Sequence, residues 1–259
     1  METEQIAEQS PQLLSAILDV GELMLIAGAE VNRVEDTISR MAYAYGYTRV
    51  DAYSIIYSIV VTVHQSDGGI ETQTRRISES VTNMRRVEQC NALSRRVCRQ
   101  PMSLEELTEE IESIRREKHY PEWALLLFSG ICSASFSGFF GGSVEDMIAA
   151  FFGGLAVRLV LLAGRRLKVQ NLILTMLCSA VAGILTVFFT RLGLGDSVDK
   201  IMIGNIMLLI PGLAFTTSLR DMIRGDLISG LLVLISALIQ AIAIAVGVVV
   251  VMWQAGGGI

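Results

Sequence analysis

The chain has 259 residues and a net charge of −5; 52% of its residues are hydrophobic and 18% are charged. Residues 1–120 hold 19 of the 26 Asp and Glu residues and 13 of the 21 Lys and Arg residues. This charge balance gives no argument for nucleic-acid binding, and the uneven spread predicts a soluble N-terminal domain followed by a membrane domain. The four cysteines show no CxxC spacing, so neither a disulfide framework nor a zinc site is indicated.

The first 77 residues combine a helical pattern with a strand pattern. Apolar residues recur at spacings of three and four from Leu14 to Tyr45, which predicts an amphipathic helix or a helix pair hinged at Gly28. From Tyr47 to Val63 the odd positions are mostly large and apolar, so we expect one strand there. The Asp67-Gly68-Gly69 sequence predicts a turn into a second strand, Ile70 to Ile77, and hence a β-hairpin.

Two charged helices are expected next. The first is basic and runs from about Ser80 to Arg99; the second opens at Ser103, with Glu106 three residues on in a capping-box pattern. Arginine pairs suggest a surface for nucleic acid or lipid, but the acidic stretch from Glu105 to Glu117 favours a solvated basic face paired with that second helix. The pairs are Arg75-Arg76, Arg85-Arg86 and Arg95-Arg96.

The rest of the chain is a series of apolar runs separated by short charged turns. Windows near the bilayer requirement of about 20 residues predict five membrane spans. They are 123–140, 144–163, 169–189, 201–219 and 227–253. The sequence therefore predicts an α-helical integral membrane protein with about five transmembrane helices in residues 121–259 and a cytoplasmic α+β domain in residues 1–120.

The basic residues at the ends of the spans predict the orientation. Eight of them would lie on one side of the membrane and only Arg191 and Lys200 on the other. The acidic opening Met-Glu-Thr-Glu-Gln has no basic region of the secretory type, so we expect a cytoplasmic N-terminus and a C-terminus outside the cytoplasm. The eight are Arg115, Arg116, Lys118, Arg165, Arg166, Lys168, Arg220 and Arg224.

The fourth span contains a Pro-Gly pair. Pro211 removes a backbone donor and crowds the carbonyl group of Met207, while Gly212 loosens the next turn, so the helix should break there. In a membrane, freed backbone groups are tolerated where protein buries them or where they line a watery cavity, which makes a broken span a candidate translocation site. The alternative is a kink that serves packing only.

Polar side chains near this break are the candidate substrate ligands. Asn205, Thr216, Thr217 and Ser218 offer neutral donors and acceptors, although such groups also bond their own helix or hold neighbouring helices together. Arg158 lies inside the second span, where it would either pair with an anionic substrate or extend toward the Arg165-Arg166 end.

Two carboxylates follow the fourth span. Asp221 and Asp226 are the candidates for proton coupling, and Asp221 would equally suit an interfacial ion pair with Arg220 or Arg224. No Ser-His-Asp, Cys-His or metal-ligand arrangement is visible elsewhere in the sequence, so we expect no enzyme activity, no metal and no cofactor.

Three motifs taken in order resemble the threonine/serine exporter (ThrE) family. They are Gly28-Ala29-Glu30-Val31-Asn32-Arg33-Val34-Glu35, the turn Phe139-Phe140-Gly141-Gly142-Ser143, and Pro211-Gly212 with Asp221 downstream. The resemblance covers nearly the whole chain. Full-length members carry ten spans, so a chain with about five is similar to the larger subunit of the split, YjjP-like branch. That branch implies a separate small multi-span membrane partner (YjjB-like) and succinate export.

These observations favour a subunit of an inner-membrane secondary exporter for threonine and serine or for a succinate-type dicarboxylate. We expect it to work with the second small membrane subunit and to contact membrane lipids, and a higher oligomer of the two subunits is compatible with the sequence. We expect no nucleic-acid partner. The competing hypothesis is a membrane-anchored sensor or regulatory protein whose soluble domain binds a ligand or partner. A sensor has no need of a broken, hydroxyl-lined span.

Overall fold

The computed structural model describes residues 2–78, 81–116 and 120–255. Contacts divide the chain into two compact units. The first comprises Met1–Lys118 together with Thr217–Val233, and the second comprises His119–Thr216 together with Leu234–Ile259. Residues 217–233, which include the end of the expected fourth span and the start of the fifth, therefore group with the N-terminal part of the chain.

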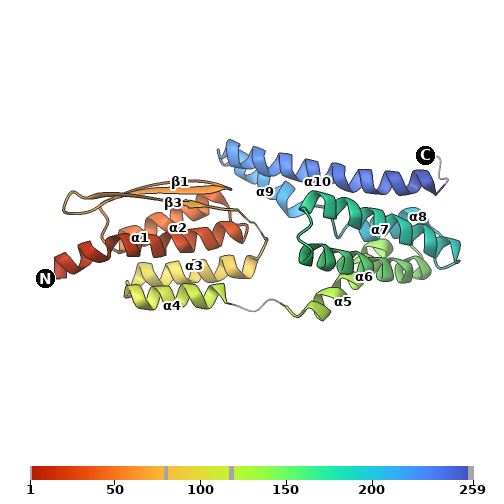
Figure 1. Cartoon of the computed structure of the whole chain (residues 1–259), viewed down its shortest axis with the longest axis horizontal. Coiled ribbons are helices and arrows are strands. Elements are labelled where there is room, and N and C mark those ends of the chain that lie inside the picture. Colours follow the sequence, from red (N-terminus) through yellow and green to blue (C-terminus); the bar gives the residue numbers. More distant parts are fainter. Residues whose placement is uncertain (1, 79–80, 117–119, 256–259) are drawn as a thin grey trace. The chain divides into compact units, whose positions relative to one another are not determined.

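The first unit is built on a helix pair, as the apolar spacing predicts. Helix α1 (Glu2–Ile26) and helix α2 (Val31–Ala44) are joined at Gly28, whose φ of +82° is readily adopted by glycine. Figure 1 shows the sheet on one side of this pair and helices α3 and α4 on the other. The largest side chains of the shared core are fully buried: Leu14, Ile17, Leu18, Met24, Ile38, Met41, Ile59, Leu93 and Leu107.

The predicted single strand from Tyr47 to Val63 is wrong. It is two strands, β1 (Arg49–Ile55) and β2 (Ser58–His64), which pair antiparallel across the tight turn Ile56-Tyr57. This turn reverses the inward-facing parity, so that Tyr53 is exposed while Ser54 and Ile59 are buried. The turn carries none of the Gly, Asn or Pro residues that usually mark one, and the apolar alternation therefore appeared continuous.

The predicted hairpin after β2 is confirmed. Strand β3 (Ile70–Arg76) pairs antiparallel with β2, giving the order β1-β2-β3. In the connecting turn Gly68 has a φ of +89°, and the backbone N–H of Gly69 donates to the Asp67 carboxylate at 2.9 Å. The turn chemistry read from the sequence is therefore present in the structure.

Two charged helices complete the helical layer. Helix α3 (Met84–Arg99) begins later than expected, because Asn83 is its N-cap and accepts from the Arg86 N–H at 3.1 Å; Ser80 lies outside the described residues. The capping box that opens α4 (Leu104–Arg115) is confirmed, with Ser103 and Glu106 bonded reciprocally. Arg96 of α3 binds Glu110 of α4 through two bonds of 2.9 and 2.8 Å, as a basic face paired with an acidic helix predicts.

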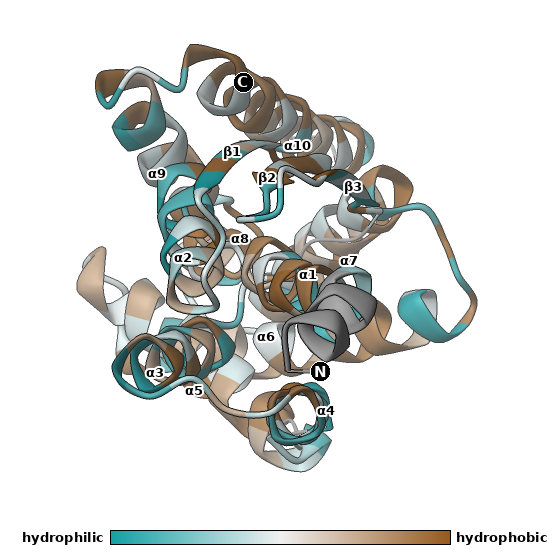
Figure 2. Ribbon diagram, turned by 90° about the vertical axis from the view of Figure 1, so that its left-hand side faces the viewer, coloured by the Kyte–Doolittle hydropathy of each residue, from teal (hydrophilic) through white to brown (hydrophobic). Residues whose placement is uncertain are grey.

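The rest of the chain is helical. It contains α5 (Glu122–Phe139), α6 (Val144–Arg166), α7 (Asn171–Arg191), α8 (Val198–Ile206), α9 (Gly212–Ile223) and α10 (Leu227–Gln254). Among the described residues, α5, α6, α7 and α10 have the length and apolar composition needed to cross a membrane. Figure 2 shows hydrophobic residues along most of α10. The expected fourth span, 201–219, is instead divided between two short helices, so the count of five spans stays a prediction.

Candidate functional site

The break between α8 and α9 is the first part of the candidate site. Helix α8 ends at Ile206 and α9 begins at Gly212, so the predicted interruption at Pro211-Gly212 is confirmed. Within the break, the carbonyl oxygen of Leu209 accepts from the Gln240 side chain of α10 at 3.2 Å. A polar side chain thus replaces part of the interrupted hydrogen-bond ladder, which is how irregular backbone is tolerated in an apolar surrounding.

Asn205 lies in the helix before the break and is fully buried. The Ser133 hydroxyl of α5 lies 3.1 Å from both the Asn205 side-chain oxygen and the Gly204 carbonyl oxygen, and its single proton is shared between them. The amide nitrogen Nδ2 of Asn205 has no hydrogen-bond partner within the described part of the chain. Asn205 is therefore enclosed among helices in this conformation.

Small residues make that close approach possible. A Cβ atom on Gly153 of α6 would lie 2.3 Å from Asn205 Nδ2, and one on Gly204 would lie 2.5 Å from the Ser133 carbonyl oxygen. A Cβ on Gly154 would lie 2.6 Å from the Ser133 hydroxyl oxygen. Helices α5, α6 and α8 thus meet along a glycine and serine seam (Ser133, Gly153, Gly154, Gly204) with one buried amide in it, the type of packing that joins helices in membranes.

The hydroxyl groups that follow the break lie in different environments from that of Asn205. Thr216 is exposed, and its hydroxyl lies 3.1 and 3.0 Å from the carbonyl oxygens of Gly212 and Leu213 in its own helix. Thr217 is half-buried, Ser218 is fully buried and Pro211 is partly exposed. Thr216 therefore bonds its own helix, whereas Asn205 bonds α5, and these two predicted ligands do not share a hydrogen-bond partner.

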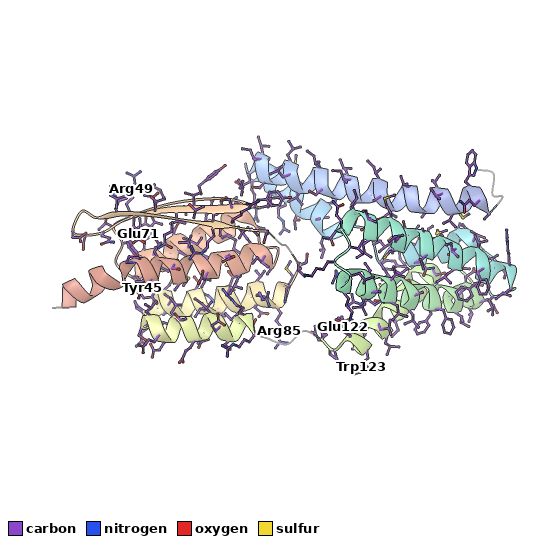
Figure 3. All side chains as sticks on the ribbon, in the orientation of Figure 1. Tyr45, Arg49, Glu71, Arg85, Glu122 and Trp123 are labelled. Carbon is purple, nitrogen blue, oxygen red and sulfur yellow. The ribbon has the colours of Figure 1, made fainter. Side chains whose placement is uncertain are left out.

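Arg158 forms an ion pair within the membrane helices. Its guanidinium lies 3.0 Å from the carboxylate of Glu122 in the first turn of α5, and 16% of its side chain is exposed. Figure 3 labels Glu122 and its neighbour Trp123 at the start of that helix. The Nε atom of Arg158 is buried without a partner in the described residues. Arg158 thus reaches the end of the bundle where α5 begins and α6 ends.

A carboxylate and guanidinium cluster connects the α1–α2 turn with the α9–α10 turn, all inside the first unit. One oxygen of Glu30 lies 2.6 Å from Arg220 Nη1, and the other pairs with Arg224 Nη1. The Glu30 side chain is 11% exposed, whereas those of Arg220 and Arg224 are 48% and 49% exposed. An ion pair with these arginines was the alternative to proton coupling for Asp221, but the carboxylate with which they form ion pairs is Glu30.

Three more carboxylates lie in the same region. Asp221 is buried, and burial raises the pKa of its carboxyl; the negative charges of Glu30 and Asp226 raise it further, against the opposing effect of the arginines. Burial also raises the pKa of Glu35, although the Ser54 N–H donates to this carboxylate at 2.6 Å. One Asp226 oxygen is buried without a partner in the described residues.

The sequence does not predict that Glu30 pairs with Arg220 and Arg224, or that Glu35 lies near the like charge of Asp226. Both residues stand in the first of the three family motifs, but Glu30 and Arg224 are 194 positions apart. No local pattern joins positions so distant. The charged turn after an apolar span was the sequence signal for Asp221 and Asp226, and it does not indicate that Glu30 and Glu35 lie near them.

Asp146, also missed, connects two turns in the second unit. Its side chain is 1% exposed, and one oxygen accepts from the backbone N–H groups of Asp196 and Ser197 at 2.8 and 3.0 Å. The other oxygen accepts from the Ser143 N–H at 2.9 Å in a capping box at the start of α6. A Ser-x-x-Asp sequence signals the cap, whereas the bonds to the α7–α8 turn depend on the tertiary fold.

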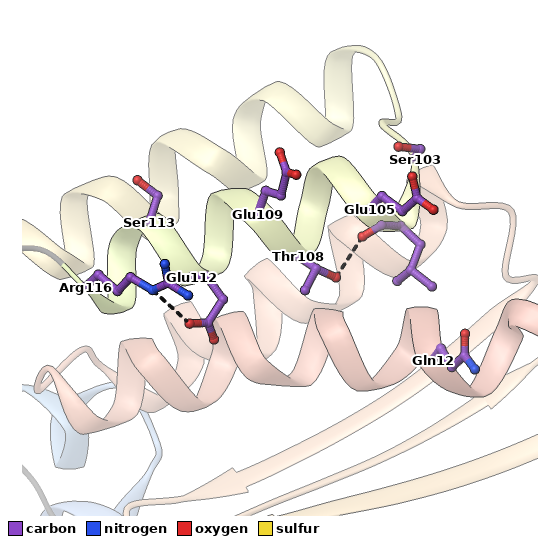
Figure 4. A pocket seen from close by; sticks show the side chains of 9 residues that line it. Gln12, Ser103, Glu105, Thr108, Glu109, Glu112, Ser113 and Arg116 are labelled. Carbon is purple, nitrogen blue, oxygen red and sulfur yellow. Dashed lines mark hydrogen bonds and ion pairs between the residues drawn. The ribbon is translucent and has the colours of Figure 1, made fainter.

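A further hollow lies between α1 and α4, away from these clusters. It has a volume of about 1340 Å³, and Glu105, Glu109 and Glu112 lie along it (Figure 4). Glu112 pairs with Arg116 and Arg115, and the hollow opens to solvent. Within the described residues, no three His, Cys, Asp or Glu side chains gather as a metal site would require. We assign no binding role to this acidic surface.

Comparisons with known proteins bear on the whole chain. A family model described as "Putative threonine/serine exporter" matches residues 15–253. "Probable succinate transporter subunit YjjP" of Escherichia coli K12 is 26% identical over 93% of this chain and 94% of that protein. The protein of the same name from Klebsiella aerogenes is 26% identical over 90% of each chain. "Pheromone-regulated membrane protein 10" of Eremothecium gossypii is 24% identical over 69% of this chain and 24% of that protein. No solved structure matches.

Proposed function

Because the chain belongs to the threonine/serine exporter (ThrE) family, we propose that it is a subunit of a secondary exporter in the bacterial inner membrane. The family match over residues 15–253 carries this proposal, since it includes the soluble helices, the apolar helices and the break between α8 and α9. An interrupted membrane segment is the usual location of a transporter's binding site. The exporter moves a small polar metabolite outward, driven by an ion gradient.

The substrate is threonine or serine, or a dicarboxylate of the succinate type. Two bacterial relatives that align along nearly their whole length are named as succinate transporter subunits, which makes succinate the first compound to test. Each of these compounds carries at least one carboxylate. Recognition of a carboxylate is therefore a common requirement, whichever substrate is exported.

The exporter needs a second subunit. The two bacterial relatives are named as subunits, and the described part of this chain has one interrupted segment, whereas transporters commonly bind substrate between two repeats. We propose a small multi-span partner of the YjjB-like type. The chain alone is expected to be inactive in transport.

The proposed topology has five spans, and the fourth, residues 201–219, comprises most of α8, the break and the first part of α9. Residues 1–120 then form the cytoplasmic domain and residues 121–259 the transmembrane domain, with the C-terminus outside. The proposed substrate ligands are Asn205, Pro211, Gly212, Thr216, Thr217 and Arg158. Asp221 and Asp226 are the proposed coupling residues, since a carboxylate whose pKa is raised, as that of Asp221 is, binds and releases a proton more readily near neutral pH.

Efflux measurements test this function. Cells that lack related exporters are loaded with succinate or threonine and express the chain with a small multi-span membrane protein of the proposed YjjB-like type. We expect efflux from cells that contain both proteins and none from cells with either alone. Absence of efflux from cells that contain both at normal membrane abundance refutes the exporter and favours the sensor.

The role of the break requires variants. A Pro211→Ala/Gly212→Ala double variant should lose most efflux at unchanged abundance, because a continuous helix removes the backbone groups proposed to bind substrate. Asn205→Leu and Thr216→Val should each lose efflux for the same reason. Leu213→Ala, on the same exposed part of α9, serves as the control. Near-normal efflux in all of the site variants would mean that the break serves packing only.

A further inference from the structure

Glu30 holds an unusual position for a side chain that binds two arginines. It is the N-cap residue of α2, where a side chain commonly accepts a hydrogen bond from the first turn of its own helix. The Glu30 side chain makes no such cap bond and instead extends to Arg220 and Arg224. Its present partners are therefore tertiary, and its charge is not required for the start of α2.

The arginines supply a site of the right shape for a carboxylate. Arg220 and Arg224 are four positions apart, so they project from the same side of the helical turn. Each takes one oxygen of the same carboxylate, and about half of each side chain remains exposed. Guanidinium groups arranged in this way recognise carboxylates specifically.

The surrounding charges allow this site to hold only one carboxylate at a time. The two guanidinium groups form ion pairs with Glu30, and the negative charges of Glu30 and Asp226 already act on the neighbouring Asp221 carboxyl. A second anion beside Glu30 would meet uncompensated negative charge. An incoming carboxylate must therefore replace Glu30 rather than join it.

We propose that Arg220 and Arg224 form a carboxylate-binding site at the end of α9, and that Glu30 occupies it in this conformation as an internal mimic of a substrate carboxylate. The inference rests on the proposed export function and extends it, because it places the first contact of a cytoplasmic substrate at this pair. Release of Glu30 frees the α1–α2 turn from the α9–α10 turn. The N-terminal domain thereby senses whether the site is filled by its own residue or by substrate.

Binding to the purified full chain tests the proposal. Radiolabelled succinate is titrated into nanodiscs of the wild type and of Glu30→Gln, which keeps the size of the side chain and removes its charge. If Glu30 occupies the site in about nine of ten molecules, the variant should bind succinate about tenfold more tightly. Glu110→Gln, which breaks another ion pair with two bonds in the same unit, should bind as the wild type does.

Variants of the arginines and competing compounds complete the test. Arg220→Gln and Arg224→Gln should each weaken binding at least tenfold, in the wild-type and in the Glu30→Gln background. Neutral succinamide should not compete, and competition by L-threonine distinguishes an amino-acid site from a dicarboxylate site. A purely structural ion pair predicts the opposite result for Glu30→Gln, namely unchanged or weaker binding, and that result would overturn the proposal.

Hydrogen exchange of the wild-type chain tests the same proposal without relying on the folding of a variant. Succinate should increase hydrogen exchange in the segment 28–35, because release of Glu30 loosens the α1–α2 turn, and succinamide should leave exchange unchanged. Protection of this segment, or no change at saturating succinate, contradicts the mimic. Efflux is measured in parallel: if the complete exporter moves no substrate but Glu30→Gln gains affinity, the export function fails and the binding site stands.

Discussion

Replacing Asp146 by alanine removes the acceptor that joins the α5–α6 turn to the α7–α8 turn. Two loop N–H groups, of Asp196 and Ser197, lose a carboxylate partner. Each bond to a charged acceptor contributes about 1.5–3 kcal/mol, and loss of the capping box costs about 1 kcal/mol more. Because water can reach a turn after truncation, we take the lower end of the range, and the change in the free energy of unfolding is roughly 3–4 kcal/mol.

Thermal unfolding in detergent measures this effect. For a protein of this size, 1 kcal/mol shifts the midpoint by about 2–4 °C, so Asp146→Ala should unfold roughly 6–16 °C below the wild type. Glu145→Ala is the matched control, since this neighbouring carboxylate lies exposed in the same helical turn and contributes at most about 1 kcal/mol through the helix dipole. If both variants unfold at the same temperature, the proposed bridging role of Asp146 is wrong.

Three more outcomes are expected. Gly153→Ala should lower the unfolding midpoint, because its Cβ would lie 2.3 Å from the Asn205 amide nitrogen. Gly212→Ala alone should not lower it, since the space around that position is open. Equal midpoints for the two variants would contradict the packing described. Burial raises the pKa of Asp221, so the folded chain keeps this proton to higher pH than the unfolded chain, and stability falls as pH rises above about 4. Asp221→Asn should therefore gain stability relative to the wild type as the pH rises from about 4 through the raised pKa, and a stability difference that stays constant from pH 4 upward would refute this. A reporter fused after Ile259 that is active only outside the cytoplasm should work, and a cytoplasmic signal would mean that the spans are miscounted.

Local chemistry explains which parts of the fold were predictable. The hinge at Gly28, the turn at Gly68, the Ser103 capping box and the break at Pro211 each depend on a residue type with a strong backbone or capping preference. The Ile56-Tyr57 turn has no such residue, so the sequence predicts two strands in the region where the structure has three. The sequence shows where a helix or strand ends only when the residues at that end have a strong backbone or capping preference.

Less of the candidate site than of the fold could be predicted from the sequence. Asp221 and Asp226 were found because they are charged and follow an apolar segment. Their neighbour Glu30 lies at the other end of the chain, and its ion pairs arise only when residues 217–233 pack with the N-terminal unit. The enclosed state of Asn205 likewise depends on two other helices, α5 and α6. Pairings of this kind are fixed by tertiary packing, which one sequence does not display.

The glycine and serine seam among α5, α6 and α8 has a mechanical consequence. Helices in a membrane gain little from burying apolar groups against each other, since lipid is equally apolar, and close contact and hydrogen bonding hold them instead. At Ser133, Gly153, Gly154 and Gly204 themselves no large side chain interlocks, so the helices can separate at these positions by a small movement, whereas Phe151 and Met147 of α6 pack against Gly130 and Gly138 of α5 on either side. Ser133 and Asn205 would then exchange a bond with each other for bonds with water or solute. The same small residues that let these helices pack closely therefore also leave little steric resistance at the seam when the helices move.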